Sequence, residues 1–344
     1  MCRLGILGGG QLGKMLSQAA RKLEFPVEVS IYDTSDYACA REDADRFHRG
    51  SFEDIEAIQR FAEDLDIITY EFENIPVAVV ASLSHAIQGS EALRILQNRL
   101  LEKEFVDSLP GIPCVPHAQV GLGFSMDYPF IVKTVQFGYD GKGQYLINDV
   151  NDLAHVKTGM VAERYFPTLT EYSMVIARNV DGTTTHYPTF ENVHVNQILD
   201  TTRFATIDKG LEEQLFEKAK NIALALDYIG VLTVEYFFAD GKLYVNEVAP
   251  RVHNSGHITL DAANISQFDL HLYSLLGITY PEITIDPDWC MVNVLGQHYM
   301  AVREKSLPGK FYDYGKHSTT KNRKVGHING KLQYLDLLKK AREE

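Results

Sequence analysis

Two acidic residues stand in otherwise apolar runs near the middle of the chain. Glu235 lies in the run 234–238, Glu247 lies in the run 243–248, and Asp240-Gly241 separates the two runs. An Asp-Gly pair between two β-rich runs is typical of an antiparallel hairpin. Because side chains alternate between the two faces of a strand, the register of this hairpin decides whether the two acids meet.

A two-residue loop would place Glu235 and Glu247 on opposite faces, whereas a three-residue loop with a glycine bulge would place them opposite each other. We expect the odd-length loop. Two facing carboxylates repel and need a cation between them, and their hard oxygens suit Mg²⁺, which keeps waters and substrate phosphates as its other ligands. The alternative is a surface hairpin with acids in water, but Tyr236, Phe237 and Phe238 need cover on at least one face.

A second candidate for anion chemistry is a lysine followed by a glycine-rich loop. Lys133 ends an apolar strand predicted over 128–134, and a buried lysine needs an anionic partner. The following stretch 135–144 contains three glycines and Lys142, and its amides could wrap phosphates. It lacks the Walker A pattern. The alternative is a hairpin tip without a ligand.

The N-terminal pattern contains a complete dinucleotide fingerprint. A strand over 3–7 precedes Gly8-Gly9-Gly10-Gln11-Leu12-Gly13, a helix is predicted over 14–23, and a second strand over 27–32 ends at Asp33. On its own this predicts an NAD-dependent oxidoreductase.

Strands and helices then continue to alternate, with helices predicted over 54–64 and 77–85 and a strand over 67–72. Such alternation builds a parallel, doubly wound sheet. The acids of Tyr70–Pro76 follow the last strand, at the edge where ligands bind, or they cap the next helix.

The remaining elements divide the chain further. A helix is predicted over 94–109, and the proline-rich 109–116 marks a boundary. Strands are predicted over 161–166, 171–178 and 185–192, and helices over 209–227 and from Ser266 to Leu276. A last small unit over 288–334 contains a basic cluster, which alone could be a solvated turn.

The composition restricts the classes of function. The chain has 344 residues, 45% hydrophobic and 23% charged, which suggests a soluble protein of two or three domains. The formal net charge of −13 argues against a nucleic-acid partner. We see no signal peptide and no apolar stretch of membrane-spanning length, so we expect a cytoplasmic protein without a membrane partner. The four cysteines are far apart and predict free thiols.

The order of these motifs resembles the ATP-grasp superfamily preceded by its Rossmann-like domain, and within it the family of N5-carboxyaminoimidazole ribonucleotide synthetases. The motifs that carry the resemblance are GGGQLG at Gly8, YEFENIP at Tyr70, GYDGKGQ at Gly138, NEVAPRVHNSGH at Asn246, YGK at Tyr314 and RKVGH at Arg323. The resemblance implies an α/β fold, α+β in its central part. Its domains would be a Rossmann-like domain over 1–95, an ATP-grasp domain over 96–275 with a lid over about 114–168, and a small β-rich C-terminal domain over 276–344.

The resemblance also implies a reaction. ATP phosphorylates bicarbonate to carboxyphosphate, and the amine of aminoimidazole ribonucleotide takes the carboxyl group, directly or through CO₂. The products are the N5-carboxyamino ribonucleotide, ADP and phosphate, in purine biosynthesis. ATP and Mg²⁺ are the implied cofactors, and a homodimer is the implied assembly.

The resemblance assigns roles residue by residue. Mg²⁺ would lie on Glu235 and Glu247, and Arg251, His253 and Lys316 would be catalytic. ATP would contact the following residues: Arg99, Lys133, Gly138, Tyr139, Asp140, Gly141, Lys142, Gly143, Gln144, Glu163, Arg164, Tyr165, Phe166, Glu171, His194, Asn246 and Glu247. The ribonucleotide would contact Gln11, Leu12, Glu71, Tyr139, Asp140, Arg251, Lys316 and Arg323.

Two positions depart from related sequences. Many ATP-grasp enzymes carry Asn where this chain has Ala249, so that metal-side role would pass to water or to Asn254. Family members often have arginine before GYDGKGQ, where this chain reads Val135-Gln136-Phe137. The alternatives to the carboxylating enzyme are a dehydrogenase, a formate-dependent glycinamide ribonucleotide transformylase, and a noncatalytic nucleotide-binding regulator.

Overall fold

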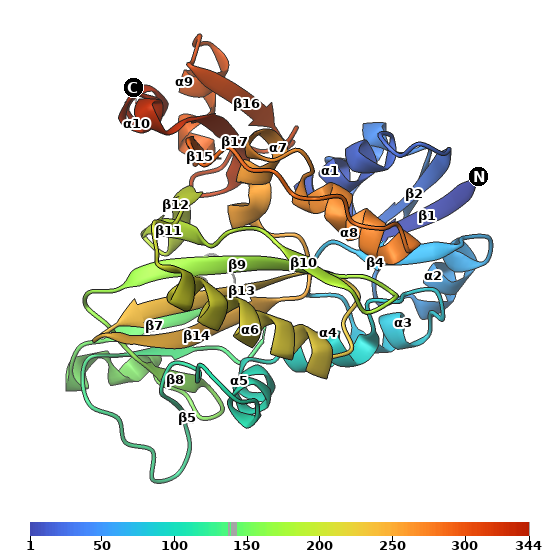
Figure 1. The fold of residues 1–344 in the computed structure, drawn as a ribbon. Coiled ribbons are helices and arrows are strands. Elements are labelled where there is room, and N and C mark those ends of the chain that lie inside the picture. The colour runs from blue at the N-terminus through green and yellow to red at the C-terminus, as the bar shows by residue number, and fades with distance from the viewer. Residues whose placement is uncertain (137, 139–142, 344) are drawn as a thin grey trace.

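The computed structural model describes residues 1–136, 138 and 143–343, which form three sheets with their covering helices (Figure 1). The N-terminal sheet has the order β3-β2-β1-β4 and is parallel throughout. Its strands are β1 (Cys2–Leu7), β2 (Val27–Asp33), β3 (Arg46–Arg49) and β4 (Ile67–Tyr70). Among the described residues this confirms the predicted doubly wound arrangement.

Helices cover the N-terminal sheet and connect it to the centre. They are α1 (Gln11–Ala20), α2 (Ile55–Ala62), α3 (Val77–Ala81), α4 (Ser90–Leu96) and α5 (Arg99–Ser108), with a 3-10 turn η1 (Arg41–Asp43). The single helix predicted over 94–109 is wrong. Asn98 takes an extended conformation and its side chain accepts hydrogen bonds from the amides of Leu100 and Leu101, so it ends one helix and caps the next.

The second sheet is small and antiparallel, with the order β5-β8-β6-β7. Its strands are β5 (His117–Gln119), β6 (Phe130–Lys133), β7 (Gln144–Ile147) and β8 (Val161–Arg164), and a 3-10 helix η2 (Val150–His155) follows β7. Phe130, Val132 and Ile147 belong to a buried cluster of its own. This unit corresponds to the segment predicted as a lid.

A nine-stranded antiparallel sheet forms the centre, with the order β14-β13-β9-β11-β12-β15-β17-β16, and β10 pairs with β9. The strands are β9 (Thr170–Arg178), β10 (Thr184–His186), β11 (Phe190–Val195), β12 (Ile198–Phe204), β13 (Gly230–Ala239), β14 (Lys242–Ala249), β15 (Trp289–Leu295), β16 (Gly309–Asp313) and β17 (Lys324–Lys331). The predicted boundary near residue 276 does not interrupt this sheet, because β12 pairs with β15.

One predicted strand of this sheet is wrong in its extent. The segment 185–192 forms two strands, β10 and β11, rather than one. Pro188 lies between them and lacks the amide that a continuous ladder would need.

Helices pack on the central sheet. The longest, α6 (Lys209–Ala225), lies across β9 and β13, and α8 (Gln267–Leu276) lies between the sheet and α1 (Figure 1). The remaining elements are η3 (Asn254–Ile258), α7 (Thr259–Ala262), η4 (Gly296–His298), α9 (Tyr299–Arg303), η5 (Leu332–Tyr334) and α10 (Leu335–Glu343). Within the described ranges, every helix is too short or too polar to span a bilayer.

Candidate active site

The two acids of the central hairpin face each other, as predicted, but for a different reason. Ala239 pairs with Lys242, so the loop has only two residues, Asp240 and Gly241, with φ of 51° and 71°. The prediction of an odd-length loop is therefore wrong. The register shifts by one residue between Glu235 and Tyr236, and Asn246 is the extra residue of a β-bulge. This bulge pairs Glu235 with Glu247.

The bulge also brings Asn246 to the acids. Its side-chain amide donates to Glu235 Oε2 over 3.2 Å, while its Oδ1 is buried without a hydrogen-bond partner in the described part of the chain. His253 Nε2 lies 3.5 Å from Glu235 Oε1. Burial raises the pKa of Glu235 to about 7. The nearby His194 lowers this pKa, and the charge of Glu247 raises it. The charge of Glu247 therefore disfavours the ionised form of Glu235.

This donor set fits Mg²⁺. Two carboxylates and an unpartnered amide oxygen are hard oxygen ligands, and Mg²⁺ characteristically completes its shell with waters and phosphates. No cluster of three or more acidic, histidine or cysteine ligands occurs among the described residues, so a dedicated all-protein metal cage is not what these residues offer.

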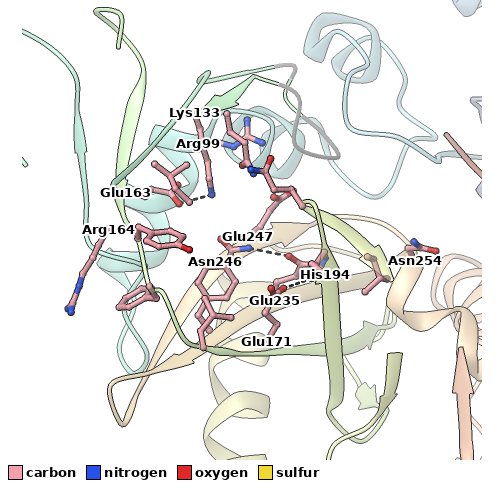
Figure 2. A pocket seen from close by; sticks show the side chains of 18 of the residues that line it. Arg99, Lys133, Glu163, Arg164, Glu171, His194, Glu235, Asn246, Glu247 and Asn254 are labelled. Atoms are coloured by element: carbon pink, nitrogen blue, oxygen red, sulfur yellow. Dashed lines mark hydrogen bonds and ion pairs between the residues drawn. The ribbon is translucent and has the colours of Figure 1, made fainter. Parts of the chain in front are cut away.

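The acids open into a cavity of about 640 Å³ between the small sheet and the central sheet (Figure 2). It is lined by Arg99, Ile131, Lys133, Gln144, Glu163, Arg164, Tyr165, Phe166, Pro167, Thr168, Leu169, Glu171, His194, Gln197, Leu199, Glu235, Phe237, Asn246, Glu247, Arg251, His253, Asn254 and Lys324. The structure thus brings together most of the residues predicted for ATP and metal, from segments as far apart as residues 99 and 247.

Lys133 finds the anionic partner that its position requires. Its Nζ lies 2.6 Å from Glu163 Oε2, and the other oxygen of Glu163 lies 3.0 Å from the ammonium of Lys103 on α5. Burial alone would raise the pKa of Glu163, but the charges of Lys103 and Lys133 have the larger effect and lower this pKa to about 2. Figure 2 shows Lys133 and Glu163 directed toward each other at the edge of the cavity.

Arg99 holds the base of the glycine-rich loop. Its guanidinium donates to the carbonyl oxygens of Thr134 and Gly138, both over 3.0 Å. The Thr134 amide donates to the Gly143 carbonyl over 2.8 Å, which closes the neck of the loop. The predicted contacts Tyr139, Asp140, Gly141 and Lys142 lie outside the described residues.

The strand β8 leads into one wall of the cavity. Arg164 points away from it in Figure 2 and pairs with Asp240 over 2.7 Å, with its guanidinium 4.8 Å above the Phe166 ring. Phe166 is buried and stacks on Tyr244. This leaves Tyr165 and the backbone of this segment to face a ligand.

The opposite wall carries an acid and a histidine. Glu171 Oε2 lies 2.5 Å from His194 Nδ1. Burial by itself would lower the pKa of His194, but the hydrogen bond and the charge of Glu171 raise it. The pair therefore presents a fixed, polar group next to Glu235.

Arg251 and His253 lie at the inner end of the cavity. Arg251 Nε lies 2.8 Å from Glu73, which follows β4, so the YEFENIP segment reaches the cavity through this pair. Burial and the charge of Arg251 lower the pKa of His253 well below its usual value. Gln267 fixes the His253 backbone, since its side chain accepts from the amide over 2.9 Å and donates to the carbonyl over 2.7 Å.

A second group at α1 contains four of the predicted ribonucleotide residues: Gln11, Leu12, Glu71 and Lys316. Glu71 is buried and accepts from the amides of Gly10 over 2.8 Å and Gly13 over 3.3 Å. Leu12 packs in the core, so only its backbone could meet a ligand. Lys316 is half-buried and close enough to Glu71 to stabilise its charge.

Two of the predicted ribonucleotide residues, Arg323 and Gln11, are more open. Arg323 is exposed and donates to the Ser318 carbonyl over 3.3 Å, and Gln11 is half-buried at the start of α1.

The glycine-rich turn at residue 8 does not have the geometry of a dinucleotide site. The Glu71 carboxylate occupies the N-terminus of α1, where a pyrophosphate would need to bind. Asp33, the acid expected on a ribose, accepts from the amides of Gly9 and Ser35, both over 2.7 Å. The fingerprint therefore describes backbone geometry around two carboxylates rather than a dehydrogenase site.

Three family models match successive parts of the chain. They describe a ribonucleotide synthetase preATP-grasp domain over 1–97, an ATP-grasp domain over 119–268, and a phosphoribosylaminoimidazole carboxylase C-terminal domain over 290–334. The N5-carboxyaminoimidazole ribonucleotide synthase of Staphylococcus aureus (strain COL) is 38% identical, over 94% of this chain and 91% of the relative. This chain belongs to the N5-carboxyaminoimidazole ribonucleotide synthase family. The Bacillus subtilis (strain 168) member is 37% identical over 94% of this chain and 90% of its own.

Solved structures of N5-carboxyaminoimidazole ribonucleotide synthases agree with this fold. The S. aureus enzyme complexed with ADP has a TM-score of 0.91 at 35% identity, covering 100% of this chain and 97% of that one. The enzyme from Aspergillus clavatus in complex with ADP and 5-aminoimidazole ribonucleotide has a TM-score of 0.85 at 26% identity, covering 99% and 98%.

Several side chains of this synthase-family site were not predicted from the sequence. Glu73, Lys103 and Lys324 line or support the cavity. Glu102 is buried beside Lys103 and accepts from the Val248 amide over 2.5 Å, which ties α5 to β14. The sequence did contain a signal for Glu102 and Lys103. Together with Arg99 they have the spacing of residues on one face of a helix, and Arg99 was already predicted to contact ATP.

Proposed function

We propose that this chain catalyses the ATP-dependent carboxylation of 5-aminoimidazole ribonucleotide with bicarbonate, yielding N5-carboxyaminoimidazole ribonucleotide, ADP and phosphate. The observation that carries the proposal is the pairing of Glu235 with Glu247 by the bulge, in the same cavity as Lys133 and Arg251. Membership in the synthase family supports the choice of substrates.

The nucleotide would occupy the cavity between the two sheets. Lys133 and Arg99 supply positive charge near the glycine-rich loop, and Tyr165, Glu171 and His194 form the walls where adenine and ribose would lie. Glu235, Glu247 and the Asn246 amide oxygen would hold Mg²⁺, which when bound neutralises the charge of the ATP phosphates. The role of the missing metal-side Asn at position 249 would pass to Asn246.

The first step transfers a phosphoryl group. A bicarbonate oxygen attacks the γ-phosphorus, the bond from that phosphorus to the β–γ bridging oxygen breaks, and ADP leaves with carboxyphosphate formed. Arg251, held in place by Glu73, would supply charge to the bicarbonate. Burial and the charge of Arg251 lower the pKa of His253, which favours its neutral form, so His253 would orient the reactants rather than add charge.

The second step forms the carbon–nitrogen bond. The exocyclic amine of the ribonucleotide attacks the carboxyl carbon of carboxyphosphate, or CO₂ released from it, and phosphate leaves with its bridging oxygen. The proton lost from the amine can pass to the phosphate. Lys316 and Arg323 would hold the phosphate of the ribonucleotide, with Gln11, the Leu12 backbone and Glu71 near its ribose.

Three further proposals extend the family resemblance and the sequence patterns. They are a homodimer, a cytoplasmic location, and the domain limits 1–95, 96–275 and 276–344. Light scattering on the purified protein tests the dimer.

The function is tested by ADP release with each substrate omitted in turn. We expect full turnover only with ATP, Mg²⁺, bicarbonate and 5-aminoimidazole ribonucleotide together. Turnover with formate and glycinamide ribonucleotide would favour a transformylase, and ATP binding without turnover under any condition would favour a noncatalytic regulator.

A further inference from the structure

A buried lysine on α5, Lys103, contacts two residues of the cavity wall without lining the cavity itself. The side chain of Lys103 is 1% exposed, and its ammonium lies 3.0 Å from Glu163 Oε1. The same nitrogen donates to the Asn246 carbonyl over 3.4 Å, at the bulge of β14. Lys103 is absent from the lining of the cavity, so it acts only through these neighbours.

Lys103, Glu163 and Lys133 form a line of alternating charge. Glu163 is 2% exposed and uses one oxygen for each lysine, with 2.6 Å to Lys133 Nζ. Lys133 is 12% exposed and lines the cavity. The group of three therefore carries one net positive charge, and its outer end faces the place where nucleotide phosphates would lie.

The inner lysine determines how much of that charge reaches the cavity. If Lys103 were absent, Glu163 and Lys133 would form a neutral pair with the carboxylate fully committed to Lys133. Interactions in a partly buried site are stronger than in water, so Glu163 would then compete with phosphate oxygens for the Lys133 ammonium. With Lys103 present, its ammonium compensates the charge of the Glu163 carboxylate, so that the charge of Lys133 is left for the phosphates.

We propose that Lys103 is a positioning residue that neutralises Glu163, so that Lys133 presents its positive charge to the phosphates of the nucleotide. This inference rests on the proposed ATP site. The low pKa of Glu163 agrees with it, since the acid stays ionised between the two lysines despite its burial. The contact with the Asn246 carbonyl also ties this ammonium to the strand that bears Glu247.

The test uses charge rescue. We compare wild type, Lys103→Met and the double variant Lys103→Met/Glu163→Gln, whose triad again has one net positive charge. The control is Lys218→Met: Lys218 is also buried, but it donates to the carbonyls of Val106, Leu109 and Pro110 and lines a different cavity. The probes are ADP, measured by calorimetry, and adenosine, measured by NMR titration.

We expect Lys103→Met to raise the dissociation constant of ADP roughly 10- to 100-fold, the range for losing one charge-assisted contact. The dissociation constant of adenosine should change by less than about 3-fold, because adenosine has no phosphate. The double variant should bind ADP at least about 5-fold more tightly than Lys103→Met does, and the Lys218 control should bind both probes as wild type does.

A double variant that binds ADP no better than Lys103→Met would overturn the proposal, as would an equal loss of adenosine affinity. If Lys103→Met does not fold, the double variant decides alone: an ADP affinity that falls about tenfold further below wild type than the adenosine affinity does contradicts a charge role, because a lost contact between Glu163 and the nucleoside weakens both probes. Binding is measured without turnover, so failure of the carboxylation assay with intact ADP affinity counts against the proposed function and not against this inference. Wild-type protein that does not bind ADP would overturn both.

Discussion

Replacing Glu247 by Gln keeps the shape of the side chain but removes one of the two facing charges. In the absence of metal, the charge of Glu247 contributes to the raised pKa of Glu235, so the two carboxylates oppose each other. We therefore expect the melting temperature of the apo variant to equal that of wild type or to exceed it by about 1 °C.

With Mg·ATP the sign should reverse. Ligand at 100 times its dissociation constant stabilises the fold by about 2.7 kcal/mol. An unfolding entropy of about 2.1 cal/mol/K per residue, applied to this chain as one cooperative unit, converts this into a rise of about 4 °C. If the lost ligand weakens binding about 100-fold, the same concentration stabilises by about 0.4 kcal/mol and raises the melting temperature by less than about 1 °C.

The assay is thermal melting with and without Mg·ATP, beside a turnover measurement. Turnover should fall by at least about 100-fold, since the metal neutralises charge in phosphoryl transfer. Glu191→Gln is the matched control, because Glu191 pairs with Arg203 on the same sheet outside the cavity. If Glu247→Gln gains the full Mg·ATP shift and turns over at the wild-type rate, the facing-acid metal site is wrong.

Three other outcomes are expected. Lys316→Ala and Arg323→Ala should each weaken ribonucleotide binding roughly 10- to 100-fold and leave ATP affinity unchanged, and calorimetry showing intact ribonucleotide affinity would contradict their assignment. Gly143→Ala should destabilise the fold by about 1–2 kcal/mol in urea unfolding and raise the KM for ATP. The reason is that Gly143 has φ of +75° and that an added Cβ would lie 2.7 Å from Thr134 Oγ1. An unchanged unfolding free energy and an unchanged KM would refute this. Burial lowers the pKa of His271 to about 3, below the value in the unfolded chain. The contribution of His271 to stability is therefore complete above about pH 6.5 and falls by roughly 2 kcal/mol at pH 5. His271→Gln should lose less stability than wild type between pH 8 and pH 5, and equal losses would exclude this role of His271.

The hairpin shows what the sequence can and cannot predict. The apolar runs and the Asp-Gly turn followed from residue types and alternation, whereas the pairing of Glu235 with Glu247 was predicted from an odd-length loop that the structure does not have. The bulge at Asn246 did not, because nothing in a local pattern distinguishes an extra residue in the loop from an extra residue in the strand. The structure places the shift beside the acids, where it also brings the Asn246 side chain to Glu235.

Other features were hidden because they depend on distant contacts. Asn98 breaks a helix that its neighbours favour, although an Asn preceding a charged first turn is a recognisable cap. Lys103 reads as an ordinary charged residue of an amphipathic helix, and only the packing of α5 against β8 and β14 reveals its partners. The long central sheet crosses the boundary near residue 276 that the family resemblance implied, since pairing between β12 and β15 has no sequence signal.

The central claim is carboxylation through a phosphorylated bicarbonate, and isotope transfer tests it most directly. The enzyme is given ATP, Mg²⁺, 5-aminoimidazole ribonucleotide and bicarbonate labelled with ¹³C and ¹⁸O, and the products are read by NMR and mass spectrometry. The account predicts ¹³C in a carbamate on the ribonucleotide, equal in amount to ADP, and one bicarbonate ¹⁸O in each phosphate. Phosphate without ¹⁸O, or ADP formed without a labelled carbamate, would contradict it.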